Sequence, residues 1–90
     1  MIKTLYPVTP AKAEALRAAL AFWGANKARV RQMRNGACRV NLATVDHRSA
    51  ARDAFVELNA CTASGQSFTD VKSRFAWNGP TEIFIRFLEP

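Results

Sequence analysis

Arginine is the residue type in this sequence that is best suited to binding chemistry, and it is concentrated in the stretch 27–44, KARVRQMRNGACRVNLAT. A planar guanidinium can bind a phosphate or a carboxylate through two parallel hydrogen bonds. Because strand-like runs flank Asn35-Gly36 in this stretch, we expect a β-hairpin that fixes the arginines in space. The chemistry that this pattern indicates is the binding of anions.

The register of the hairpin decides which side chains share a face, because side chains alternate strictly along a strand. A two-residue turn at Asn35-Gly36 mixes apolar and cationic side chains on both faces. A three-residue loop over 35–37, with Gly36 at the positive φ of a bulge, pairs Gln32 with Val40 and separates the two kinds of side chain. We therefore predict an apolar face (Ala28, Val30, Cys38, Val40, Leu42) and an open, arginine-rich face (Arg29, Arg31, Met33, Arg39, Asn41).

Composition predicts one folded domain over residues 1–90, with 49% apolar and 22% charged residues. Thirteen Lys and Arg against seven Asp and Glu give a formal net charge of +6, and most of the cations are arginines. A polyanion, either RNA or single-stranded DNA, or an acidic protein surface is the partner that this charge favours. Basic composition for solubility alone is the competing explanation.

Metal, cofactor and membrane roles are not indicated by the sequence. Cys38 and Cys61 stand outside any C-x-x-C spacing, so we expect both to be reduced and no metal or cofactor to be bound. His47 lies beside Asp46 without a second candidate ligand or nucleophile nearby. No apolar run approaches the ~20 residues that span a bilayer, and no leader pattern opens the chain, so a cytoplasmic location without membrane contact is expected.

Periodicity predicts the elements that must position the hairpin. Helix one should span Pro10 to Trp23, between a Thr9 cap and Gly24, and helix two should run from an Asp46 cap to about Ala60. The inward positions are Leu16, Ala19, Leu20 and Trp23 in the first helix and Ala51, Ala54, Phe55 and Leu58 in the second; Arg48, Arg52, Asp53 and Glu57 should face water. The further segments are strands over 2–8, 68–77 and 81–88 and a loop over 61–66.

This order is that of an α+β, ferredoxin-like βαββαβ sandwich with an extra C-terminal strand or hairpin. Two helices then cover one face of an antiparallel sheet and leave the other face open, which agrees with the hairpin pattern. Either 68–77 or 81–88 can be the strand that pairs with the first strand. Enzymes of this class are disfavoured: residues 7–10, PVTP, are neither the glycine-rich phosphate loop of an acylphosphatase nor the paired-cysteine loop of a metal carrier.

The chain resembles an RNA recognition motif from about Leu5 to Trp77. The segments that carry the resemblance are Leu5-Tyr6, 35–42 (NGACRVNL), 50–60 (AARDAFVELNA) and Gly65. The resemblance implies an RNA-binding sheet face on which Tyr6 and other exposed aromatics stack bases. The family usually has aromatics at the two exposed third-strand positions, where this sequence has Ala37 and Arg39; an arginine plane can also stack on a base.

We therefore expect a non-catalytic module that binds RNA or single-stranded DNA. The expected site is Tyr6, Arg29, Arg31, Arg39, Asn41, Phe84 and Arg86. The alternative is a protein-binding module that uses the same face against an acidic surface, for example a phage-encoded, anti-CRISPR-like inhibitor of a nucleic-acid-processing complex. A third arrangement pairs two copies through the sheet face as a homodimer.

Overall fold

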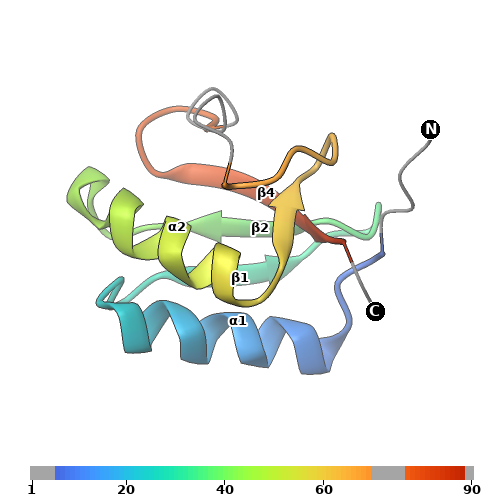
Figure 1. Cartoon of the computed structure of the whole chain (residues 1–90), viewed down its shortest axis with the longest axis horizontal. Coiled ribbons are helices and arrows are strands. Elements are labelled where there is room, and N and C mark those ends of the chain that lie inside the picture. The colour runs from blue at the N-terminus through green and yellow to red at the C-terminus, as the bar shows by residue number, and fades with distance from the viewer. Residues whose placement is uncertain (1–5, 70–76, 89–90) are drawn as a thin grey trace.

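The computed structural model describes residues 6–69 and 77–88, in which two helices pack on one face of a four-stranded antiparallel sheet (Figure 1). The sheet has the order β1-β2-β4-β3. The elements are α1 (Pro10–Trp23), β1 (Arg29–Gln32), β2 (Cys38–Asn41), a 3-10 turn η1 (Val45–His47), α2 (Arg48–Glu57), β3 (Ala60–Thr62) and β4 (Glu82–Phe87). No helix in the described part of the chain has both the length and the hydropathy needed to cross a bilayer.

Helix α1 has the predicted bounds because its two ends carry strong local signals. The Thr9 Oγ1 accepts the Lys12 N–H at 3.2 Å, and Gly24 ends the helix at φ 102°. Leu16 and its inward neighbours Ala19 and Leu20 are buried as expected. The inward placement of Trp23 is wrong: its side chain is 41% exposed, and its indole Nε1 donates to Glu57 at the surface.

The hairpin register differs from the prediction by two residues, but the two faces are as predicted. Gln32 lies opposite Cys38 rather than Val40. The loop begins one residue earlier than expected, because the Met33 N–H donates to the Ala37 carbonyl at 2.9 Å and leaves 34–36 as the turn. Gly36 takes φ 86°, the bulge role assigned to it. A shift of two residues preserves the side-chain alternation, so the arginines stay on the open face.

The second helix is shorter than predicted at both ends. Thr44, not Asp46, accepts the first free N–H, and η1 precedes α2. The helix stops at Glu57 because Asn59 adopts φ 58°. The chain then enters β3, which occupies the first part of the segment expected to be the loop 61–66. The predicted inward residues Ala51, Ala54 and Phe55 are fully buried.

Strand β4 lies between β2 and β3 and supplies the centre of the core. Ile83, Ile85 and Phe87 are buried under the helices, as the alternation predicted. The expected strand over 2–8 contributes one bridge, Tyr6 to Phe87, and residues 1–5 lie outside the described residues. The expected strand 68–77 also falls largely outside them, at 70–76, although Phe68 at its start is in the core. The α+β class with helices on one face is confirmed.

Candidate binding face

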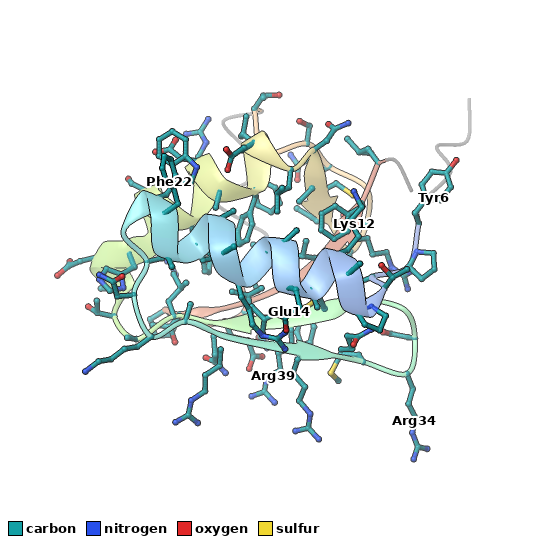
Figure 2. The ribbon with its side chains drawn as sticks, turned by 90° about the horizontal axis from the view of Figure 1, so that it is seen from below. Tyr6, Lys12, Glu14, Phe22, Arg34 and Arg39 are labelled. Carbon is teal, nitrogen blue, oxygen red and sulfur yellow. The ribbon has the colours of Figure 1, made fainter. Side chains whose placement is uncertain are left out.

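The sheet surface opposite the helices gathers the charged side chains of three strands, and we call it the arginine face. It consists of Arg29 and Arg31 from β1, Arg39 and Asn41 from β2, and Glu82, Phe84 and Arg86 from β4. Figure 2 views the sheet edge-on and shows Arg39 pointing away from the helix layer, with Arg34 of the hairpin loop on the same side. The inward residues between them, such as Val40 and Ile85, fill the core. The fold therefore places a cationic surface on a rigid sheet.

The strand register arranges these side chains in rows across the sheet. Arg31 lies opposite Arg39, and Arg39 lies opposite Phe84, so two guanidiniums and an aromatic ring form one row. In the next row, Asn41 stands between Arg29 and Glu82. Like charges directly opposite each other destabilise a sheet, so the juxtaposition of Arg31 and Arg39 costs the fold some stability.

Arg39 is neutralised and held in place by β4. Its Nη2 lies 2.7 Å from the Glu82 Oε2, and its Nε donates to the same oxygen at 2.7 Å. The other carboxylate oxygen of Glu82 accepts a hydrogen bond from Asn78 Nδ2 at 2.6 Å. The side chain of Glu82 is 17% exposed and that of Arg39 is 40% exposed, so the carboxylate lies under the guanidinium. Arg39 therefore presents a fixed plane with much of its charge already compensated.

Arg29 and Arg31 are exposed, and neither side chain has a hydrogen-bond or ion-pair partner among the described residues. A shallow groove of about 280 Å³ lies between them and β2, lined by Arg29, Arg31, Arg39 and Asn41. Two further grooves continue it along the hairpin, one lined by 27, 29 and 41–43 and the other by 31–35. Lys27 and Arg34 thus extend the cationic surface at its two ends.

Arg86 is on the expected face, but its guanidinium is already used by the hairpin. Its Nη2 donates to the Asn35 carbonyl at 2.5 Å. Gly36 is packed so closely beside it that a Cβ there would lie 3.2 Å from the Arg86 Nη1 and 3.0 Å from the Pro7 Cβ. Arg86 therefore fixes the loop that carries Arg34 and contributes less free charge than the β1 arginines.

Tyr6 is not where the sequence placed it. Its backbone bridges to Phe87, whose side chain is buried, and its ring packs against the core from the helix side of the sheet. Figure 2 shows Tyr6 level with the helices, away from Arg39. The expected position of Tyr6 on the open face is wrong, because paired residues point to the same side of a sheet and Phe87 points inward. Phe84 is the aromatic that does lie on the arginine face, half-buried beside Arg39.

Comparison with known proteins identifies no relative. No protein-family model matches the sequence, no curated protein is significantly similar to it, and no solved structure matches its fold significantly. The function must therefore be argued from the site itself.

Other reactive groups among the described residues are not arranged as a second site. Burial raises the pKa of the Cys38 thiol to about 11, partly offset by the nearby positive charge of Arg17, so the thiol keeps its proton at neutral pH. Within the described ranges, no three His, Cys, Asp or Glu side chains cluster closely enough to hold a metal ion. The arginine face is the site that the geometry favours.

Sequence reasoning missed Glu82 on the arginine face and two cations, Lys27 and Arg34, at its ends. Lys27 and Arg34 line the outer grooves, and Glu82 neutralises Arg39. The alternation of β4 did place Glu82 on the open side, but its pairing with Arg39 depends on the β2–β4 register, which no local signal fixes. The position of Lys27 depends on its left-handed backbone, φ 64°, just before β1.

Proposed function

We propose that this protein is a non-catalytic binding module for RNA or single-stranded DNA, and that the arginine face is its binding surface. The observation that carries the proposal is the pair of guanidiniums of Arg29 and Arg31, which have no hydrogen-bond or ion-pair partner within residues 6–69 and 77–88 and line a groove that continues in both directions along the hairpin. Cations in a line suit a linear polyanion, whereas a site for one small anion brings its donors together around a point.

The spacing of the cations supports a chain of phosphates. Residues two apart on a strand are separated by ~6.8 Å, so Arg29 and Arg31 offer two separate points of contact on one side of the face. Lys27 and Arg34 lie beyond them at opposite ends of β1. Each cation that neutralises a phosphate releases counterions, so binding by this surface must weaken as salt is added.

A single strand fits the middle of the face better than a duplex does. Phe84 lies opposite Arg39, whose guanidinium is held in place by Glu82, and both side chains can stack against an unpaired base. Stacking on such a platform is worth ~1–3 kcal/mol per base, and a duplex keeps its bases covered. The ligand that this row favours therefore has exposed bases beside its phosphates.

We also propose that the fold is a variant of the ferredoxin-like fold of RNA recognition motifs. Two helices on one face of an antiparallel sheet, with the opposite face open and basic, support the ferredoxin-like, RNA recognition motif-like interpretation of the sequence. Within the described residues, the departures are that the expected first strand is represented by the Tyr6 bridge to Phe87 and that β2 pairs directly with β4.

The test compares two double variants that lower the net charge equally but at different places. Arg29→Gln with Arg31→Gln removes two positive charges from the arginine face, and Ala18→Glu with Ser49→Glu adds two negative charges on exposed positions of the helix layer. Binding of a labelled single strand of about ten nucleotides is followed by fluorescence anisotropy at several salt concentrations. We expect the first variant to bind at least about tenfold more weakly and to lose ~1.4 from the slope of log K against log salt. The second should change affinity by about twofold or less.

Equal losses in both variants would mean that net charge alone attracts the oligonucleotide, and the proposal would be wrong. If the oligonucleotide does not bind while a poly-glutamate peptide does, the face recognises an acidic protein surface instead. The affinities for RNA, single-stranded DNA and duplex probes of the same length then show which of these ligands the protein prefers.

A further inference from the structure

Glu82 is the one acidic residue within the four described strands, and it lies at the centre of a cationic surface. One oxygen of its carboxylate accepts a hydrogen bond from the Arg39 Nε and forms an ion pair with the Arg39 Nη2. A phosphate oxygen would be bound by the same two N–H groups. Glu82 thus occupies the place at Arg39 that a phosphate of the ligand would otherwise take.

A ligand does not displace this carboxylate easily. Asn78 Nδ2 donates to its second oxygen at 2.6 Å, and only 17% of the Glu82 side chain is exposed. A bound phosphate at Arg39 would also lie close to the fixed negative charge of Glu82, which repels it. The attraction of Arg39 for phosphate is therefore largely cancelled, while its plane and its outer N–H groups stay accessible.

We propose that Glu82 determines the specificity of the arginine face, because it withdraws Arg39 from phosphate binding and leaves it for the uncharged bases of a nucleic acid. This inference rests on the proposed function. Phosphates are bound by Arg29 and Arg31 on β1, and the Arg39–Phe84 row is reserved for bases. The arginine face then binds a single-stranded nucleic acid more tightly than a polyanion of the same charge that has no bases.

The experiment measures binding of two probes, inorganic polyphosphate and a single-stranded oligonucleotide with the same number of phosphates. Glu82→Gln keeps an oxygen that can accept from Asn78 but removes the charge, and Asp53→Asn makes the same change in net charge on an exposed position of α2. We expect Glu82→Gln to bind polyphosphate about two- to fivefold more tightly, with a salt slope steeper by about 1. Asp53→Asn should leave the salt slopes of both probes within error of the wild type.

A second variant removes the pair together. Arg39→Gln with Glu82→Gln leaves the net charge unchanged, so polyphosphate binding should match the wild type, whereas oligonucleotide binding should fall about twofold or more as the Arg39 plane is lost. Thermal unfolding of each variant checks that the fold is retained. A loss of polyphosphate affinity in this double variant would overturn the inference, because Arg39 would then be a phosphate ligand in the wild type.

The two proposals fail in different ways. If Arg29→Gln with Arg31→Gln weakens oligonucleotide binding but Glu82→Gln leaves both salt slopes unchanged, the binding face stands and the role of Glu82 is refuted. If the oligonucleotide binds independently of Arg29 and Arg31, the proposed function fails, and with it the specificity that depends on it.

Discussion

The arginines of the helix layer and those of β1 have opposite environments. Arg17 donates to the Val30 carbonyl at 2.9 Å, Arg52 donates to the Phe68 carbonyl at 2.9 Å, and Arg48 donates to two carbonyls, of Gly79 and Pro80, each at 2.8 Å. Arg29 and Arg31 have no such acceptor among the described residues. The formal charge of +6 therefore overstates the number of cationic side chains that are free to bind a ligand.

The difference follows from where backbone carbonyls point. Helix side chains reach turns and strand edges, where carbonyls lack ladder partners and accept from a guanidinium. Side chains on a sheet face project perpendicular to the plane in which the strand carbonyls lie, so they find no backbone acceptor beneath them. Arginines on a sheet face stay available unless a carboxylate such as that of Glu82, or a loop carbonyl such as that of Asn35 beside Arg86, is placed next to them. The variants Arg48→Ala and Arg31→Thr test this contrast.

Arg48→Ala should show the largest effect on stability. The change removes two hydrogen bonds to the 79–80 turn and the contact of the guanidinium with Trp77, 4.8 Å from its ring centroid. We expect the free energy of unfolding to fall by about 1–2 kcal/mol, discounted for the partial exposure of the site. Chemical denaturation measures this loss, and anisotropy with the oligonucleotide should show unchanged affinity. Weaker oligonucleotide binding by a folded Arg48→Ala protein would erase the distinction between the two groups of arginines.

Alkaline pH should destabilise the protein through the Cys38 thiol, which lies on the buried face of β2. The Cys38 pKa is raised to about 11 by burial, whereas an unfolded thiol ionises near 9, so the folded state holds more protons between these values and stability falls as pH rises. From pH 8 to pH 10 this contributes a loss of about 1 kcal/mol, which is absent in Cys38→Ala. Denaturation of both proteins at the two pH values isolates the thiol. A wild-type protein with the same pH dependence as Cys38→Ala would show that the thiol is not shielded.

The smallest effect is expected for Arg31→Thr. Removing the charge relieves its repulsion with Arg39 directly across the hairpin, and threonine suits a strand. We expect the free energy of unfolding to rise by about 0.3 kcal/mol while oligonucleotide binding weakens about threefold. Paired denaturation and anisotropy measurements test this opposition of stability and binding. A marked destabilisation would mean that Arg31 has a structural role like that of Arg48.

Features with a local signal could be predicted from the sequence. Thr9-Pro10 and Gly24 fix the bounds of α1, and Gly36 fixes the bulge of the hairpin loop. The side of the sheet on which each hairpin arginine lies could also be predicted from the sequence, because a two-residue error in register does not change the alternation of side chains along a strand.

Features that depend on distant contacts could not be predicted. Arg86 was expected to be free, but it bonds to Asn35, 51 residues away in the chain. The prediction for Tyr6 assumed a first strand with this ring on the open face. In the described residues that strand is represented by one bridge, from Tyr6 to Phe87, and the side chain of Phe87 points inward. The Glu82–Arg39 pair required the order of strands in the sheet, which local pattern does not contain.

Strand β1 ends the sheet, and α1 covers part of its free side. The Met33 N–H points toward β2, so by alternation the backbone groups of Val30 point outward, and the Arg17 guanidinium donates to the Val30 carbonyl. A neighbouring molecule that approached this side would find the Val30 carbonyl occupied and the cations of β1 beside it. These two features protect the exposed part of this edge strand from pairing with the edge strands of other molecules, which is how exposed edges lead to polymerisation.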